Sequence, residues 1–453
     1  MYTNPKNIKS NFNQVNFSNK EPFYGLPSNV KFCKNCTISN QRPSSEVEFY
    51  HKKNTKKKTI KFQGDTCEPC LVKKESEKID WKEREKELLE ICDKYRNKSG
   101  QYDCIVPGSG GKDSFFASYI LKHKYKMNPL TVTWAPLIPT QTGLKNIINW
   151  TNSGVDNHYV RADRRVQRLL TRIATENLLH PFQTFYLGQK LLAPKIASKL
   201  GINLIFYGEN QSAYGNDKSF LNTYKMDEVF FSIDKQNKGL YLGGEKISDL
   251  KKFFLLNDRD LQNYLPEIKS SSKKKVSYCF LSHFMKWHNQ SNYFFAKKNS
   301  DFHTASKRIQ GTYTKYISTD DEMEFINFYC MGIKYGIGWT THTTAYEIRD
   351  GDITRQEGID LIKKFDIEYP SDYIHNFLDF VSLEEKYYEK KVLNNFESPK
   401  MNKEYFDLLC DKFRSPHIWK YEKENWVLRN SIFKDNSDMN INELKNWEGN
   451  KII

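Results

Sequence analysis

The chain lacks any long uninterrupted hydrophobic run, and no stretch approaches the roughly 18 apolar residues that predict a transmembrane helix. The N-terminal stretch MYTNPKNIKSNFNQ is polar and contains no apolar segment typical of a secretory signal. Only nine cysteines occur among 453 residues. In a chain that is not secreted, these favour free thiols or metal ligands over a disulfide framework. We therefore expect a cytoplasmic protein with no membrane partner.

Acidic residues are in the minority, with 55 Asp and Glu against 70 Lys and Arg, which gives a formal net charge of +15. This surplus suits anionic partners such as nucleotides, nucleic acids or lipid head groups, and a solvated Lys-rich surface explains it equally well. The hydrophobic content of 38% excludes a largely disordered protein. The length fits two or three domains.

Strands and helices alternate through the first half of the chain. We predict strands over 102–106, 129–134, 157–160 and 203–207, with helices over 73–95, 114–125, 143–153 and 183–200. Pro194 is expected to break or kink the last helix, and Gly201 to end it. Such alternation predicts an α/β fold with a parallel sheet. Beyond residue 225 the pattern becomes irregular, and residues 320–395 are again mostly helical.

These patterns divide the chain into six parts. We predict a flexible tail (1–30), a zinc-knuckle module (31–75), a nucleotide-binding domain (76–225), an insertion or substrate region (226–310), a helical substrate-binding region (311–400) and a C-terminal extension (401–453).

The segment PGSGGKDS, residues 107–114, lies between the first predicted strand and a helix. It fails the Walker A pattern because Asp113 follows the lysine and Val106 stands where the first glycine belongs. It also fails the G-x-G-x-x-G fingerprint, which requires glycine at position 113. Two common phosphate-binding loops are thereby excluded.

The composition of this segment still favours a phosphate site. Gly110 and Gly111 allow successive backbone N–H groups to face one anion, and the following helix adds its N-terminal dipole. Ser109 and Ser114 supply hydroxyl groups and Lys112 a positive charge. Asp113 makes chemical sense if Mg²⁺ accompanies the phosphate, because magnesium prefers oxygen ligands. An ordinary glycine-rich turn is the alternative.

Two C-x-x-C pairs precede this domain: Cys33 and Cys36, then Cys67 and Cys70. Four thiolates complete a tetrahedral zinc site, and a closed site of this kind is structural. The gap between the pairs exceeds the usual ribbon spacing, so we expect a hairpin with a long basic loop. Four unrelated thiols are the alternative. The remaining cysteines are expected in the core.

Residues 109–114, SGGKDS, resemble the SGGxDS loop of the PP-loop ATP pyrophosphatases. This resemblance implies a sheet of the adenine-nucleotide α-hydrolase type. It also implies that Ser109, Gly110, Gly111, Lys112, Asp113 and Ser114 hold the β,γ-diphosphate of ATP, with Lys112 countering the charge on pyrophosphate and Asp113 helping to place Mg²⁺. ATP would be cleaved to AMP and pyrophosphate.

Further blocks are similar to the N-acetyl sugar amidotransferases of O-antigen and pseudaminic acid-type pathways. They are GTYTKYISTDD (311–321), AYEIRDGDITR (345–355), YGEN (207–210) and the cysteine pairs. The resemblance covers roughly residues 31–395. It implies that the acetamido group of a nucleotide-linked N-acetyl sugar becomes an acetamidino group in surface polysaccharide or flagellin sugar synthesis.

Several residues are candidates for contacting ligands. Gly208, Glu209 and Asn210 end the fourth strand, where ligands bind in open α/β sheets, although a capped loop is an equal alternative. Trp134 is a candidate for stacking on adenine, with core packing as the alternative. The remaining candidates would bind the sugar nucleotide: Tyr313, Thr314, Lys315, Tyr316, Arg349 and Arg355. For these the alternatives are a surface strand and solvated helix ends.

The sequence contains no Gly-x-Cys-x-Gly elbow and no N-terminal cysteine nucleophile, so it predicts no glutaminase of its own. The resemblance implies a separate glutaminase subunit, often with a cyclase-like companion, as the ammonia source. Two other functions remain open: a tRNA-modifying PP-loop enzyme of the thiolase type, and a non-enzymatic nucleotide-binding scaffold. We do not expect nucleic acid as a partner.

Overall fold

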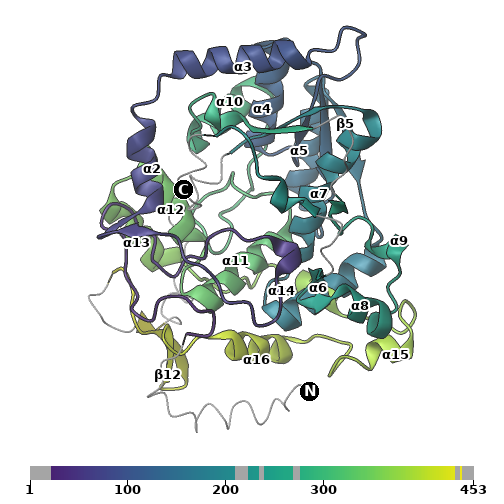
Figure 1. Cartoon of the computed structure of the whole chain (residues 1–453). Coiled ribbons are helices and arrows are strands. Elements are labelled where there is room, and N and C mark those ends of the chain that lie inside the picture. Colours follow the sequence, from purple (N-terminus) through teal and green to yellow (C-terminus); the bar gives the residue numbers. More distant parts are fainter. Residues whose placement is uncertain (1–21, 210–222, 234–238, 269–275, 434–438, 441–453) are drawn as a thin grey trace.

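The computed structural model describes residues 22–209, 223–233, 239–268, 276–433 and 439–440. Its centre is a five-stranded sheet in which every neighbouring pair is parallel. The strands are β3 (Cys104–Pro107), β4 (Pro129–Trp134), β5 (Asp156–Val160), β6 (Leu204–Tyr207) and β11 (Ser277–Phe280). Figure 1 shows this sheet on one side of the molecule, opposite the helices α2, α12 and α13. The predicted α/β class with a parallel sheet is confirmed.

The strand order is β11-β6-β3-β4-β5. The chain therefore runs outward from β3 to β5, then returns to place β6 on the other side of β3. This reversal is a topological switch point, and ligands in open α/β sheets bind outside the carboxyl ends of the strands that flank it. The loops after β3 and β6 meet there, and they contain the SGGKDS segment and Glu209.

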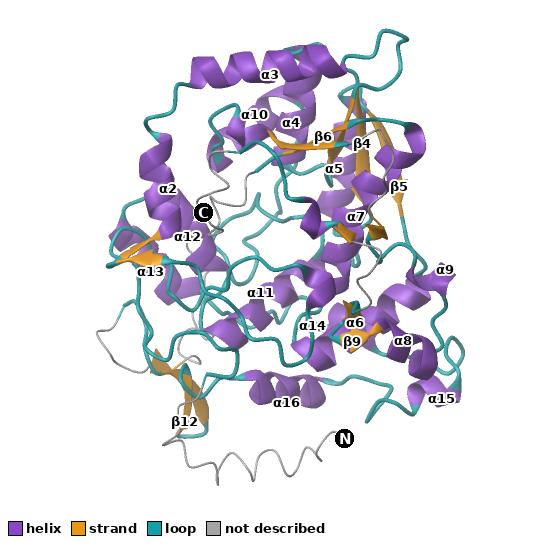
Figure 2. Cartoon of the chain, in the orientation of Figure 1, coloured by secondary structure: helices purple, strands orange, loops and turns teal. Residues whose placement is uncertain are grey.

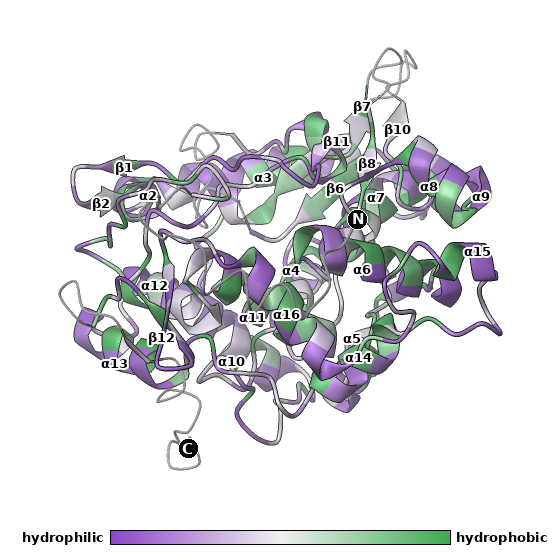
Figure 3. Cartoon of the chain, turned by 90° about the horizontal axis from the view of Figure 1, so that it is seen from below, coloured by the Kyte–Doolittle hydropathy of each residue, from purple (hydrophilic) through white to green (hydrophobic). Residues whose placement is uncertain are grey.

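The two faces of the sheet are covered by different helices. Ile105, Leu130 and Ile205 face the core cluster that includes α7 (Gln183–Leu200). Val106 and Phe206 face the opposite way, toward α3 (Trp81–Tyr95) and α4 (Lys112–His123). This division follows from the alternation of side chains along a strand. Figure 3 shows hydrophobic residues along β6 and β11, with polar residues on the outer helices.

The single helix predicted over 73–95 is divided into α2 (Glu68–Ser76) and α3, whereas α4, α5 (Gln141–Asn152) and α7 lie near their predicted positions. α7 continues through Pro194, so the predicted break does not occur, and Gly201 ends it with φ +69°. α6 (Arg164–Leu178) was not predicted, although Val166, Leu169, Leu170 and Ile173 have helical spacing.

The region 226–310 was predicted to be an insertion or substrate region, and its described residues contribute to the main sheet and to its helix packing. β11 completes the main sheet beside β6, and α10 (Asn289–Asn299) packs against α4. The fifth strand escaped prediction because SYCF is short and follows the Lys-rich stretch SSSKKK. The other elements here are η4 (Glu228–Phe230), β7 (Ser232–Ile233), β8 (Tyr241–Leu242), β9 (Glu245–Lys246), α8 (Ile247–Phe254), α9 (Asp258–Leu261), β10 (Glu267–Ile268) and η5 (Leu281–His283).

The C-terminal half is mainly helical, as predicted (Figure 2). α11 (Glu322–Tyr335) packs against α12 (Trp339–Asp350), α14 (Ile374–Val381) and α16 (Lys403–Phe413). The indole of Trp419 donates to the carbonyl of Ile333 over 2.7 Å. The described residues of the predicted extension thus pack directly on the helical region. Also present are α13 (Arg355–Phe365), α15 (Lys390–Leu393), β12 (Trp419–Glu422), β13 (Asn425–Leu428) and β14 (Met439–Asn440).

The described end of the predicted tail, residues 22–30, is packed onto this C-terminal part. The Tyr24 hydroxyl donates to the carbonyl of Phe413 over 2.6 Å, and Leu26 is buried. The cysteine module follows, with η1 (Glu48–Tyr50) and the hairpin β1 (Phe62–Gln63) and β2 (Thr66–Cys67). Among the helices of the described segments, none combines the length and hydrophobicity needed to cross a bilayer.

Candidate active site and cysteine centre

The SGGKDS segment forms a tight turn between β3 and α4, and glycine is sterically required at position 110 and at position 108 just before the segment. Gly110 has φ +81°, and a Cβ there would lie 2.8 Å from the backbone of Ile147. A Cβ on Gly108 would lie 2.2 Å from the Cβ of Ser114. Gly111 is the N-cap of α4, which places the helix N-terminus at the turn. The predicted strand–turn–helix context of an anion site is therefore present.

Lys112 and Asp113 are held by asparagines of a distant helix. The buried ammonium of Lys112 donates to Asn289 Oδ1 over 2.7 Å and also pairs with the Asp113 carboxylate. Asn292 Nδ2 donates to Asp113 Oδ1 over 2.9 Å. Ser114 Oγ donates to the Gly111 carbonyl over 3.0 Å. The two ionic side chains of the turn are thus fixed in place without a ligand.

A cavity of about 490 Å³ opens over this turn. Ser109, Gly111, Lys112, Asp113 and Ser114 line it, together with Gly208 and Glu209 at the end of β6. Its opposite wall comes from the C-terminal half, through residues 316–320, Glu324, Phe328, Trp339, His342 and Tyr346. Asn210, predicted as a cofactor contact, lies outside the described residues. The volume falls in the range of about 300–1,000 Å³ that is usual for small-molecule sites.

Two further carboxylates face the same cavity. Burial raises the pKa of Asp320, and the Ser109 side chain hydrogen-bonds to it and lowers that pKa in part. Burial raises the pKa of Glu324 to about 8, with a further contribution from Asp320. Asp113, Asp320 and Glu324 together offer the oxygen donors that Mg²⁺ prefers. Their ligand atoms do not all lie within 4.8 Å of one another, so the magnesium ion stays a prediction.

Four predicted substrate residues lie in the loop before α11, and only Tyr316 of these four lines the cavity. The hydroxyl groups of Tyr313 and Tyr316 both donate to the carboxylate of Glu347. Thr314 is buried, and the carbonyl of Lys315 accepts from the amide of Ala305 over 2.8 Å. The alternative of a surface strand is wrong because this segment is a loop anchored to α12.

Trp134 is not brought into the cavity. Its ring packs against Gly188, where a Cβ would lie 2.3 Å away, and against Tyr264 at 5.8 Å between centroids. Core packing, the alternative to adenine stacking, is therefore its observed role. Aromatic surface in the cavity comes instead from Phe182, Phe185, Tyr186, Phe328 and Trp339.

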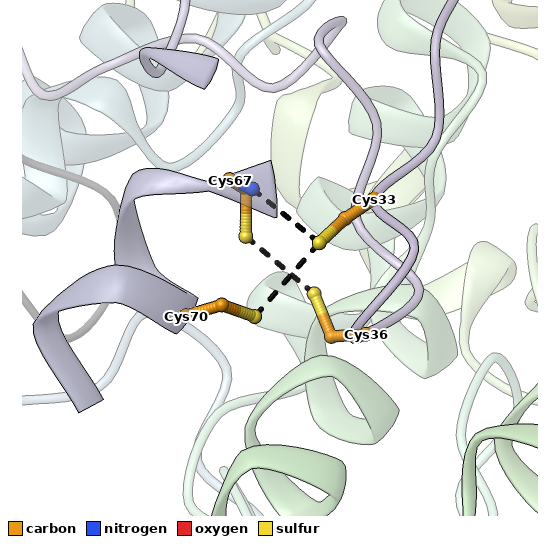
Figure 4. Close-up of side chains that lie close together, drawn as sticks. All are labelled: Cys33, Cys36, Cys67 and Cys70. Carbon is orange, nitrogen blue, oxygen red and sulfur yellow. Dashed lines mark hydrogen bonds between the residues drawn. The ribbon is translucent and has the colours of Figure 1, made fainter. Parts of the chain in front are cut away.

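The four predicted metal ligands converge (Figure 4). Cys33 and Cys36 come from one loop, Cys67 from the end of β2 and Cys70 from the first turn of α2, and their sulfur atoms point toward one another. Sγ atoms lie 3.9 Å apart for Cys33 and Cys70 and 3.6 Å for Cys36 and Cys67. A tetrahedral zinc ion with bonds of about 2.3 Å requires about 3.8 Å between sulfurs. All four ligand atoms lie within 4.8 Å of one another, so the cluster fits the predicted zinc ion.

Arg349 and Arg355 contact this cluster, which contradicts the prediction that both bind diphosphate or a sugar carboxylate. Arg355 donates to the carbonyls of Cys36 and Cys33, each over 3.1 Å. The Arg349 guanidinium lies 3.9 Å from Cys36 Sγ. Both side chains reach back from α12 and α13 because a thiolate cluster attracts cations and the knuckle exposes backbone carbonyls. They join the cysteine module to the helical region.

Several residues of the site were not predicted. Asn289 and Asn292 have helical i, i+3 spacing, but no sequence signal links them to a turn almost 180 residues earlier. Asp320 lies inside the block GTYTKYISTDD, of which only residues 313–316 were predicted to contact the substrate. The aromatic cluster HPFQTFY at 180–186 was a visible signal for a binding wall.

Comparison with known proteins finds a similarity for part of the C-terminal half. Residues 310–432 match the C-terminal domain of WbpG-like lipopolysaccharide biosynthesis proteins. This match crosses the boundary predicted at residue 400. An uncharacterized protein of Methanocaldococcus jannaschii is 34% identical over 96 residues, which cover 21% of this chain and about a third (34%) of that relative.

Two solved structures were also found. The NH3-dependent NAD synthetase of Campylobacter jejuni, in complex with nitrate, has 17% identity and a TM-score of 0.24. The alignment covers 41% of this chain and 77% of the synthetase chain. The U34-tRNA thiolase NcsA of Methanococcus maripaludis, with its [4Fe-4S] cluster, has 12% identity and a TM-score of 0.25, and covers 71% and 86%. At TM-scores this low, neither structure bears on the chemistry of this chain. The chain is thus an α/β protein whose residues 310–432 are similar to a domain of lipopolysaccharide biosynthesis proteins.

Proposed function

We propose that this protein is an ATP-dependent, AMP-forming amidotransferase that converts the acetamido group of a nucleotide-linked N-acetyl sugar to an acetamidino group. The amide oxygen attacks the α-phosphorus of ATP, and pyrophosphate leaves. Ammonia then adds to the activated carbon, and AMP leaves with the former amide oxygen. This route suits an amide, because its carbonyl is a weak electrophile and its oxygen a poor leaving group.

The residues of the turn supply what this chemistry needs. Backbone N–H groups of the turn and the N-terminus of α4 would receive the β,γ-diphosphate. Lys112 would stabilise the negative charge that develops on pyrophosphate. Asp113, with Asp320 and Glu324 in the same cavity, would hold Mg²⁺, which supplies charge neutralisation to the phosphates when bound. No covalent nucleophile of the protein is required, since positioning and electrostatics suffice.

One observation carries the proposal: a single cavity is lined both by the SGGKDS turn and by the region that matches lipopolysaccharide biosynthesis proteins. Lys112 and Asp113 lie on one side of it, and Trp339, His342 and Tyr346 of the matched region lie on the other. A phosphate-binding turn and a domain associated with surface sugars therefore enclose the same space. This arrangement supports ATP chemistry on a sugar-linked substrate.

Ammonia is proposed to come from a separate glutaminase subunit, with a cyclase-like companion as a further component. The sequence offers no Gly-x-Cys-x-Gly elbow of a glutaminase. Of the nine cysteines, five are buried in the core and four form the cluster described above; the five are Cys92, Cys104, Cys279, Cys330 and Cys410.

The experiment is ATP turnover with ammonium chloride and a panel of UDP- and CMP-linked N-acetyl sugars, followed by mass spectrometry. We expect AMP and pyrophosphate, together with a sugar nucleotide in which NH replaces O. ADP in place of AMP would refute the mechanism. Lys112→Ala is the matched negative control.

A tRNA thiolase is the second function that the same assay tests. Such an enzyme would need reactive cysteines at the nucleotide site, but none of the described residues lining the cavity over the turn is a cysteine. Burial also raises the pKa of Cys104, on the neighbouring strand, so that thiol stays protonated and weakly nucleophilic. AMP formation only with tRNA and a sulfur donor would reverse this preference.

A further inference from the structure

A second cavity, of about 580 Å³, adjoins the one over the SGGKDS turn. Glu209, Asn289 and Tyr346 line both cavities. Asn289 is also the residue that holds Lys112. A molecule in the second cavity would therefore have one end beside the phosphate-binding turn.

The cysteine module forms one wall of this second cavity. Val72, Lys73 and Ser76 line it from α2, the helix that begins at the second cysteine pair. The Lys73 ammonium pairs with Asp350 of α12 over 2.6 Å, and Arg349 connects α12 to Cys36. The position of α2, and with it the shape of the cavity, is thus tied to the four-cysteine cluster.

The other walls offer aromatic surface and charged groups of both signs. Trp81 and Trp287 both line the cavity, and the Trp287 indole donates to Glu209 over 3.0 Å. The ring of Trp287 also closes over Gly208, where a Cβ would lie 2.9 Å from it. Lys286 adds a cationic group, next to the Lys73–Asp350 ion pair and the acidic side chains of Glu77 and Glu209. Indole faces stack on a planar base, and cationic side chains attract a diphosphate.

We propose that this second cavity binds the nucleotide-linked sugar, with its base and diphosphate between α2 and Trp287 and its acetamido group directed toward Asn289 and the turn. This assignment rests on the proposed function, because it places the acceptor where its amide oxygen can reach ATP. The volume suits a sugar nucleotide, since small-molecule sites span about 300–1,000 Å³. It also gives the cysteine module a role in shaping the acceptor site.

The test fills the cavity from α2. Ser76→Phe places a ring into the space, whereas Lys74→Phe adds the same ring on an exposed position of the same helix that does not line the cavity. UDP-N-acetylglucosamine is the probe, and its binding is followed by intrinsic tryptophan fluorescence and by calorimetry. ATP binding is measured in parallel on each variant.

We expect the probe to quench fluorescence in the wild-type protein and in Lys74→Phe, and its Kd to rise at least tenfold in Ser76→Phe, with the Kd for ATP unchanged in both. Trp81→Phe should reduce the quench while retaining binding. Equal probe affinity in Ser76→Phe and Lys74→Phe would overturn the assignment, as would failure of both UDP- and CMP-linked N-acetyl sugars to bind the wild-type protein. Binding with the expected Ser76→Phe effect but without AMP formation would refute the proposed reaction and leave the cavity assigned.

Discussion

Asn289 accepts a hydrogen bond from the ammonium group of Lys112 over 2.7 Å, although 177 residues separate them in the chain. One turn further along α10, Asn292 holds Asp113 over 2.9 Å. The two charged residues of the turn are therefore positioned by a helix that the sequence did not assign to the nucleotide site. Their orientation depends on tertiary packing of α10 on α4.

Substitution Asn289→Ala should lower the rate of AMP formation by about 10- to 100-fold, because misplacing a charge-stabilising group by about 1 Å has this order of effect. Lys112 keeps Asp113 as a partner, so a stable fold is expected. Asn299→Ala, on the same helix with its amide bound to the Phe295 carbonyl, is the control and should keep wild-type activity. Turnover of Asn289→Ala at the rate of the control would contradict this positioning role.

Gly110 and Gly111 should differ sharply when each is replaced by alanine. Gly110→Ala places a Cβ at a φ of +81° and 2.8 Å from the Ile147 backbone, so a loss of about 1–3 kcal/mol in unfolding free energy is expected. Gly111→Ala meets only Ser109 Oγ at 3.9 Å and has an ordinary φ of −67°. Its stability should stay within about 0.5 kcal/mol of the wild type. Urea denaturation of both variants checks this; equal losses would show that the turn is not constrained as described.

The sequence was most informative where the relevant information is local. The turn between β3 and α4 and the C-x-x-C pairs each depend on residues within a few positions of one another, and both were located correctly. The same is true of four of the five strands, whose apolar runs are typical of a buried parallel sheet. The cysteine cluster also required two separate local motifs to come together in the fold. This convergence was predictable because each C-x-x-C pair has metal-ligand spacing and four thiolates complete one zinc site.

What the sequence could not give is the partner of a long charged side chain. Arg349 and Arg355 were expected at a diphosphate and instead reach the cysteine module. Trp134 ends a strand at the ligand edge, but its ring turns into the core beside Gly188. Both outcomes depend on which distant segment packs alongside, and composition or spacing does not encode that directly. The fifth strand was missed because four residues carry too little periodicity.

Arg355→Ala should weaken retention of zinc, because it removes both hydrogen bonds to the carbonyls of Cys33 and Cys36. We expect a lower zinc content after dialysis against a chelator, and an acceptor Kd that rises while the Kd for ATP changes little. Arg355→Lys should recover only part of this, since lysine lacks the planar fork. Gln356→Ala, the neighbouring exposed position, is the control. Zinc content equal to that control would exclude the anchoring role, and a rise in the acceptor Kd without loss of zinc would restore the original assignment to the sugar nucleotide.

Glu324 should give the ligand-free protein a recognisable pH dependence. Burial raises its pKa in the folded state to about 8, with Asp320 adding to the shift, whereas an unfolded glutamate titrates near about 4.3. Between these values the folded protein keeps a proton that the unfolded chain releases, so the free energy of unfolding contributed by this group falls as pH rises from about 4 to about 8.

Glu324→Gln removes the titrating group, so its stability should decline less than that of the wild type across this window, and the two profiles should run parallel above pH 8. Urea denaturation at intervals from pH 5 to pH 9 measures the difference. Glu385→Gln, at an exposed position, is the matched control and should follow the wild-type profile. A Glu324→Gln profile parallel to the wild type from pH 5 to pH 8 would mean that this carboxyl is already ionised at neutral pH. The Glu324 carboxylate would then already be charged in the cavity, and available as a ligand for Mg²⁺, before any nucleotide binds.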